Sequence, residues 1–163
     1  MNRSSSVPEV GVVPGARCLR DDERRVLRLV PLELDASRVR VYEGSSGAAG
    51  RLRRLVLHLS RNRAIALGNH VFLPDRCRGD LGVVAHELTH CGQYQAWGPL
   101  KYFGRGLAAQ LRDLIHRTFQ LGSSPYRYQL HPRKPFRAYG MEQQAQMVED
   151  RFRADGDQAV PSA

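Results

Sequence analysis

The chain has 163 residues and a mass of 18.4 kDa, the size of one domain with a core of its own. Hydrophobic residues make up 42% and charged residues 25%, which excludes a wholly disordered chain. No apolar run approaches the roughly 20 residues that a membrane-spanning helix needs. The composition therefore predicts a globular domain with no membrane span.

The chain is basic, with 25 Lys and Arg against 16 Asp and Glu, but its arginines are scattered along the sequence. Only short clusters occur, at Arg24-Arg25 and at Arg51-Leu-Arg-Arg54. A nucleic-acid surface needs basic residues gathered on one face to neutralise phosphates. The pattern therefore argues against nucleic acid as a partner.

Both ends of the chain lack a periodic hydrophobic pattern. Residues 1–16 contain no continuous apolar segment of the kind a secretory leader needs, so we expect a cytoplasmic protein. We also expect 1–16 and the small-residue tail 154–163 to be flexible. This leaves 17–153 as a single domain.

The first half of this domain is predicted to be mainly β-structure. Acidic residues 21–23 open an apolar segment that ends at Pro31, which predicts a short N-terminal helix. Residues 39–42 alternate as a strand does, and 44–50 form a flexible connection. Leucines at alternate positions predict a further strand over 53–59. Gly68-Asn69 then separates two short apolar runs, as in a β-hairpin.

The second half is predicted to be helical. Asp80 can cap a helix over 81–95 that has an apolar stripe on one side. Amphipathic helices follow over 107–119 and 141–152, with a loop over 122–138 between them. Strands followed by helices indicate the α+β class, here an N-terminal helix, a short β-meander or hairpin, and then three helices.

The first of these three helices carries the motif His86-Glu87-Leu-Thr-His90. Histidines four residues apart lie on one face of a helix, so both rings can bind one zinc ion at ~2.0–2.1 Å. Glu87 lies one residue after the first histidine, beside the metal rather than on it. There it can take a proton from a zinc-bound water, whose pKa zinc lowers toward ~7. We therefore predict a Zn²⁺ cofactor on His86 and His90, with Glu87 as general base.

A catalytic zinc needs a third protein ligand, and the sequence leaves several candidates open. They are His116, His131, Glu142, Glu149 and Asp150. No third histidine follows at the spacing of the metzincin motif. Glu142 is preferred because it lies near the start of an amphipathic helix that can aim it at the first helix. Glu149 and Asp150 are expected to face solvent.

The loop before Glu142 contains candidate donors to a negatively charged reacting oxygen. These are Tyr126, Tyr128, His131, Arg137 and Tyr139. Tyr139, three residues before the preferred ligand, is predicted to be catalytic. Gln93 and Gln95 are candidates to hydrogen-bond the ligands, whereas His58 and His70 are expected to be structural.

Residues 81–95, with Leu67-Gly-Asn-His-Val-Phe-Leu73 before them, resemble the eCIS core domain, a metallopeptidase domain associated with extracellular contractile injection systems. In that family a Gly-Asn or Gly-His hairpin leads into a His-Glu-Leu-x-His helix followed by glutamines. The stretch 126–145, which ends in Glu142-Gln-Gln-Ala145, is similar to the Vgr-related branch. The resemblance covers about residues 20–152 and departs from the family at Cys91, where Val or Ile is usual.

The resemblance implies a zincin-like, gluzincin-like centre with His86, His90 and Glu142 on zinc and Glu87 as catalytic base. It also implies association with contractile injection or type VI secretion machinery, and export through that apparatus. Two functions remain open. The preferred one is a small zinc metallopeptidase that hydrolyses peptide bonds in a protein or peptide substrate. The alternative is a non-catalytic zinc-binding adaptor of the secretion machinery.

Overall fold

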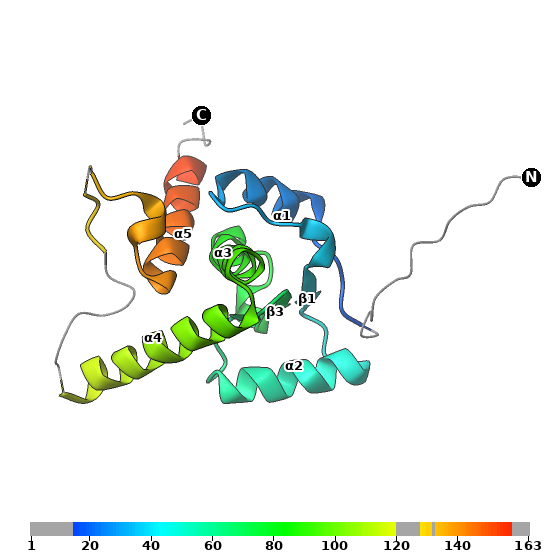
Figure 1. The fold of residues 1–163 in the computed structure, drawn as a ribbon. Coiled ribbons are helices and arrows are strands. Elements are labelled where there is room, and N and C mark those ends of the chain that lie inside the picture. The colour runs from blue at the N-terminus through cyan, green and yellow to red at the C-terminus, as the bar shows by residue number, and fades with distance from the viewer. Residues whose placement is uncertain (1–14, 120–127, 132, 158–163) are drawn as a thin grey trace, which may run out of the picture.

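The computed structural model describes residues 15–119, 128–131 and 133–157, with only the backbone of 110–119 and 156–157. Within these residues it contains five α-helices and one three-stranded mixed sheet (Figure 1). The predicted α+β class is confirmed. The predictions made for residues 1–14, 122–127, 132 and 158–163 lie outside the described residues.

The N-terminal helix forms where the acidic residues predicted it. Helix α1 (Asp21–Val26) begins after Arg20, whose backbone N–H donates to the Glu23 carboxylate at 2.8 Å. A 3₁₀ turn at Leu27–Leu29 follows, and the chain leaves the helix before Pro31. Arg17 connects this region to the sheet, because its backbone pairs with that of Val41 and its side chain forms ion pairs with Glu23 and Glu43.

The sheet consists of β1 (Arg40–Tyr42), β2 (Ile65–Leu67) and β3 (His70–Phe72), in the order β1-β3-β2. β2 and β3 form the predicted antiparallel hairpin, and the turn between them uses Gly68 at a φ of +66°, which glycine adopts without strain. β1 pairs with β3 in parallel. β2 is therefore an edge strand of the sheet.

The strand predicted over 53–59 is wrong, because this segment belongs to helix α2 (Gly47–Leu59). The helix also takes up the second half of the connection expected over 44–50. Its inward positions recur every four residues, at Ala49, Arg53 and Leu57, and all three are buried. The prediction failed because the alternating leucines also fit a helix, and Ala, Leu and Arg are strong helix formers.

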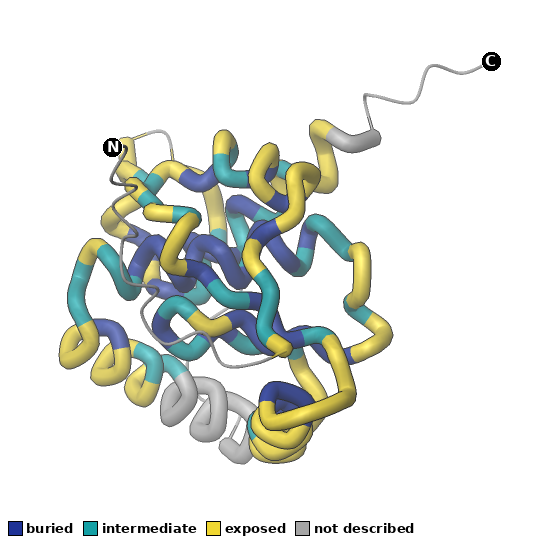
Figure 2. The backbone as a smooth tube through the Cα atoms, turned by 90° about the vertical axis from the view of Figure 1, so that its right-hand side faces the viewer, coloured by how far each residue is buried: buried dark blue, intermediate teal, exposed yellow. Residues whose placement is uncertain are grey.

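The sheet lies between two helical layers. Val41 and Val71 on one face belong to the main core, to which α3 (Leu81–Trp97) contributes Ala85 and Leu88. Successive residues of a strand point to opposite faces, so the next residues along β1 and β3 pack on the other side, against α2. That smaller cluster contains Tyr42, Ala49, Leu57 and Phe72. Figure 2 shows the buried residues gathered in the middle of the molecule.

The helix that carries the histidine motif is central to the main core. Asp80 caps α3 as predicted, accepting from the backbone N–H of Val83 at 3.1 Å, and Gly98 ends it at a φ of +76°. α4 (Pro99–Phe119) begins eight residues before the predicted Leu107, and α5 (Met141–Asp157) continues past the predicted end at 152. α5 packs along α3, which places two helix faces opposite each other. Among the described residues, we find no helix that combines the length and apolar character needed to cross a bilayer.

Candidate metal centre

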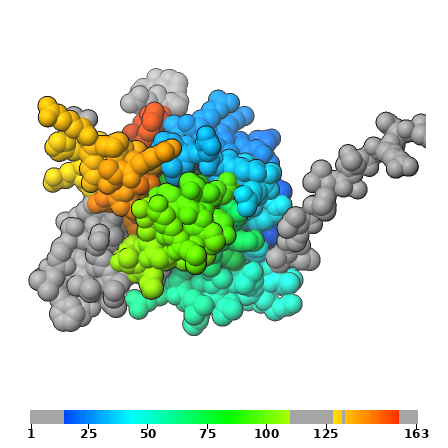
Figure 3. Space-filling model, in the orientation of Figure 1, coloured from blue at the N-terminus to red at the C-terminus, as the bar shows by residue number. Residues whose placement is uncertain are grey.

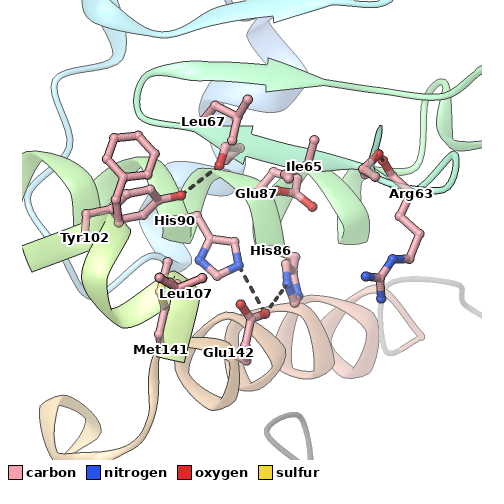
Figure 4. Close-up of a pocket in the computed structure, with 15 residues that line it drawn as sticks. Arg63, Ile65, Leu67, His86, Glu87, His90, Tyr102, Leu107, Met141 and Glu142 are labelled. Carbon is pink, nitrogen blue, oxygen red and sulfur yellow. Dashed lines mark hydrogen bonds and ion pairs between the residues drawn. The ribbon is translucent and has the colours of Figure 1, made fainter. Parts of the chain in front are cut away.

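Two helices bring the predicted ligands together. On α3, positions 86, 90 and 93 are four and three residues apart and share one face. On α5, Glu142 and Glu149 are seven residues apart and also share one face. Figure 4 shows His86 and His90 pointing from α3 toward Glu142 of α5.

The three groups have the spacing of a tetrahedral metal site. Glu142 Oε2 lies 3.7 Å from His86 Nε2 and 3.5 Å from His90 Nε2. The three ligand atoms all lie within 4.8 Å of one another. Two atoms each bound to a tetrahedral zinc at its usual bond length are about 3.3 Å apart. The residues therefore fit a zinc ion with only small movements of their side chains.

Each histidine has its other ring nitrogen occupied. His86 Nδ1 lies 3.2 Å from Glu149 Oε2, and His90 Nδ1 lies 2.9 Å from Gln93 Oε1. Both partners are acceptors, so each ring carries a hydrogen on Nδ1, and Nε2 is the nitrogen at which a metal ion could take the place of a proton. A carboxylate or amide oxygen behind the histidine is typical of zinc sites, where it fixes the orientation of the ring.

Glu87 lies beside this set but does not join it. Its side chain is buried, and one carboxylate oxygen accepts from the backbone N–H of Ala66. The other oxygen, Oε2, is buried and has no hydrogen-bond partner in the described part of the chain. A buried carboxylate oxygen without a partner is costly, and one beside candidate metal ligands indicates a missing polar group such as a water or an ion.

The charges around the rings favour a cation. Burial opposes the charged form of His86, but hydrogen bonds to Glu142 and Glu149 outweigh it and raise the pKa of His86 to about 10. Burial likewise opposes the charged form of His90, and Glu142 reverses this and raises the pKa. Although burial raises the pKa of Glu142, the two rings hold it well below its usual range. The site therefore holds positive charge strongly, as protons on the rings or as a metal ion in their place.

A cavity of about 400 Å³ opens onto the candidate ligands. Arg63 and the edge strand β2 line one side, and Tyr102, Phe103 and Leu107 of α4 line another (Figure 4). Phe103 and Leu107 are 49% and 69% exposed, so this wall is both apolar and open to solvent. The cavity has room for one or two side chains of a ligand.

The free edge of β2 is partly occupied by the protein itself. A two-residue turn makes Leu67 and His70 a hydrogen-bonded pair, so the backbone groups of Ala66 point away from β3. The Ala66 carbonyl accepts from the Tyr102 hydroxyl at 2.8 Å, and its N–H donates to Glu87. Tyr102, Ala66 and Glu87 thus form a continuous chain of hydrogen bonds from α4 through β2 to α3.

The structure does not bring Tyr139 to the metal ligands. Its hydroxyl donates to the Gln129 carbonyl at 3.2 Å and accepts from the backbone N–H of His131 at 3.0 Å. Lys134 Nζ lies 4.2 Å from the centre of its ring. The Tyr139 hydroxyl therefore stabilises the loop that precedes α5, and the catalytic role expected for Tyr139 stays a prediction.

The other candidates divide between the site and the surface. Glu149 was expected to face solvent but contacts His86, with its side chain only 16% exposed. Asp150 is exposed as expected. His131, which the sequence left open as a ligand, is exposed as well. The side chain of His116 lies outside the described residues. Among the alternatives left open for the third ligand, Glu142 is the group that lies against both rings.

The two glutamines after the motif have different roles. Gln93 is fully buried, and its amide donates to the Met141 carbonyl at 3.0 Å and to Gln144 Oε1 at 3.1 Å. It therefore bonds a candidate ligand, as the sequence suggested, and it also joins His90 to the start of α5. Gln95 instead bonds Asp35 and Asn69 away from the ligands. His70 is structural as expected, with its Nδ1 3.0 Å from the Tyr42 hydroxyl.

Sequence reasoning missed two contributors to the site, Gln144 and Tyr102, and expected a third, Glu149, to face solvent. Glu149 is seven residues after Glu142, and this spacing alone places both on one helix face. The buried Gln144 donates to the Tyr139 carbonyl at 2.8 Å and so holds the start of α5, and no sequence pattern signals this contact. Tyr102 likewise meets Ala66 across 36 positions of the chain.

Two histidines and a glutamate from two helices, with a second buried glutamate beside them, define a candidate mononuclear metal centre in a small α+β domain. Residues 31–98 match the family model of the eCIS core domain. The match contains His86, Glu87 and His90, whereas Glu142 lies beyond it.

The family match points to an association with contractile injection systems. Neither the curated proteins nor the solved structures contain a significant match to the chain. The Vgr-related branch and the zincin-like fold therefore stay predictions.

Proposed function

We propose that the protein is a zinc-dependent hydrolase of peptide bonds, with His86, His90 and Glu142 as the metal ligands. The donor set supports zinc, because two neutral imidazoles and one carboxylate leave a fourth position open for a catalytic site. When bound, zinc would polarise the scissile carbonyl and make a water acidic enough to attack it at neutral pH.

The observation that carries the proposal is the free Oε2 of Glu87. A purely structural buried carboxylate would have both oxygens bonded, yet only one is held, by Ala66. Burial also raises the pKa of Glu87, which brings it closer to the range that suits a general base at neutral pH. Oε2 is thus the atom that takes a proton from the attacking water and passes it to the leaving amine.

The remaining residues of the site hold the candidate ligands and Glu87 in position. Glu149 and Gln93 fix the two rings, and Tyr102 fixes the Ala66 peptide that holds Glu87. Phe103 and Leu107 offer an apolar wall to a substrate side chain. These contacts are typical of a preorganised site, in which the protein orients the ligands before the substrate binds.

The test is Glu87→Gln in the full chain supplied with zinc, assayed on a mixed peptide library with products identified by mass spectrometry. We expect hydrolysis to fall by about 10²–10⁴-fold while the zinc content stays unchanged. Glu33→Gln is the matched control, because Glu33 is exposed and lies outside this cavity. Equal activity in Glu87→Gln and the wild type would refute the proposal.

A non-catalytic zinc-bearing adaptor of a contractile injection system is the second candidate. Two observations favour it: the family match, and the occupied edge of β2. Peptides commonly bind by adding a strand to a free sheet edge, but the outward groups of Ala66 are already bonded within the protein. An adaptor would bind zinc yet cleave nothing, and it would co-purify with components of the injection apparatus.

A further inference from the structure

Helix α2 has two apolar faces, only one of which is used within the fold. Ala49 and Leu57 pack against the sheet, whereas Leu52, Leu55 and Leu59 are 37%, 57% and 74% exposed. The three exposed leucines recur at i, i+3 and i+7, so they form one stripe along the helix. We call this stripe the α2 outer face. Figure 3 shows α2, in turquoise, along the lower edge of the molecule, and in Figure 1 no other described element lies beyond it.

The outer face is bordered by positive charge. Residues 44–74 contain five arginines and no Asp or Glu. One of them, Arg53, is buried and bonds Leu73 and Asp75, so it belongs to the fold. Of the other four, Arg63 lines the cavity of the candidate metal centre, and the remaining three are exposed and form no ion pair within the described residues: Arg51, Arg54 and Arg61. Arg51, Arg54 and His58 lie together on one side of the leucine stripe.

The positive charge beside the α2 outer face favours some binding partners over others. A second copy of the same face would bring the arginines of the two chains together, which like-charge repulsion opposes. Nucleic acid would satisfy the arginines but leave the leucines in water. An amphipathic helix with its own leucine stripe and flanking carboxylates satisfies both features of the surface.

The size of the stripe also favours a protein partner. Three leucines on a helix of 13 residues provide the i, i+3 and i+7 anchors typical of helix-to-helix docking. Helices that lie in a membrane surface usually add bulky aromatic residues, and α2 has no Phe, Trp or Tyr. We propose that the α2 outer face is a docking surface for an acidic amphipathic helix of a partner protein. This inference does not depend on the metal site or on hydrolysis.

The test uses the full chain and a synthetic helical peptide with leucines at i, i+3 and i+7 and glutamates on either side. Binding is measured by fluorescence anisotropy at low and at physiological salt. We expect Leu55→Asp to weaken binding about tenfold or more, because an anchor in the centre of an interface carries much of the affinity. Leu59→Asp serves as a second variant in case the first unfolds. Leu130→Asp is the matched control, because Leu130 is 74% exposed and lies far along the chain from α2.

Charge and alternative occupants are tested in the same series. Arg54→Glu should weaken binding of the acidic peptide, and a peptide with lysines in place of the glutamates should not bind. Vesicles of neutral and anionic phospholipid, and gel filtration over a range of protein concentrations, test a lipid surface and a second copy. The proposal would be overturned if the acidic peptide does not bind, if both peptides bind equally, or if Leu55→Asp binds as the wild type does. It would also be overturned if the protein binds vesicles and no peptide, or if it self-associates in a way that Leu55→Asp abolishes.

Discussion

Glu149 Oε2 lies 3.2 Å from His86 Nδ1, on the side of the ring opposite the nitrogen that faces Glu142. The other oxygen of this carboxylate, Glu149 Oε1, accepts a hydrogen bond from Arg153 at 2.8 Å. Arg153 also donates to Asp80, the residue that caps α3. Asp80, Arg153, Glu149 and His86 therefore form a continuous polar chain between the start of α3 and the middle of α5. The ring of His86 is oriented before any ion binds.

Replacing Glu149 by Gln should lower the zinc affinity about 10- to 100-fold without abolishing binding, because partners behind a ligand tune it in this range. Competition with a chromophoric chelator gives the affinity. Asp150→Asn is the control, since Asp150 is the next residue, is exposed and bonds only Gln146 and Tyr128 among the described residues. Equal affinities for the two variants would show that the contact of Glu149 with His86 has no part in metal binding.

Gln93→Leu should destabilise the protein by on the order of 3 kcal/mol, because it leaves several buried polar groups without partners. These groups are His90 Nδ1, the Met141 carbonyl and the Gln144 amide oxygen. Urea unfolding measures the effect through its midpoint. Gln95→Leu should lower the free energy of unfolding much less, because the hydrogen bonds between Gln95 and Asp35 are exposed. A result in which the two variants unfold at the same urea concentration would contradict the role assigned to Gln93.

The metal-free protein should become less stable as the pH rises from about 6.5 toward about 10. The folded pKa of His86 is raised from 6.5 to about 10, so its stabilising charge is fully present below 6.5 and is lost as the pH rises through the folded value. Urea unfolding of chelator-treated protein across this range tests the slope. His86→Gln should show a smaller loss, and a midpoint that rises with pH in the wild type would contradict the assignment.

Tyr102→Phe should cost about 1–2 kcal/mol of stability, because it removes the donor to the Ala66 carbonyl in a buried place. Tyr94→Phe is a suitable control: its ring packs edge-on against Tyr102, but the described residues give its hydroxyl no hydrogen bond. Thermal unfolding compares the two. Similar losses for both variants would mean that the Tyr102 hydroxyl contributes little.

The sequence predicted the local features of this fold well. Asp80 caps the motif helix, Gly68-Asn69 turns the hairpin, and the four-residue spacing places His86 and His90 together, because each of these depends on neighbours in the chain. Glu142 lies against both rings for a related reason, since the amphipathic pattern of α5 fixes which side packs on α3, and its role as a metal ligand stays a prediction.

The errors come from signals that were ambiguous or absent. Alternating leucines over 53–59 satisfy both a strand and a helix, and only packing of Arg53 under the sheet decides between them. Tyr139 was chosen by its closeness to Glu142 in sequence, whereas the structure bonds its hydroxyl to the backbone of residues 129 and 131, a contact that no sequence pattern signals. The contact of Tyr102 with Ala66 depends on how α4 crosses the sheet edge, which no local pattern encodes.

The central claim, a zinc centre built from α3 and α5, is tested most directly by the metal content of the untagged protein. Elemental analysis should find about one zinc ion per chain in the wild type after zinc is supplied, and far less in Glu142→Ala. Glu33→Ala, an exposed glutamate outside the cavity, should retain the wild-type content. Zinc retained in Glu142→Ala would place the third ligand elsewhere, and a wild type that binds no zinc would contradict the account.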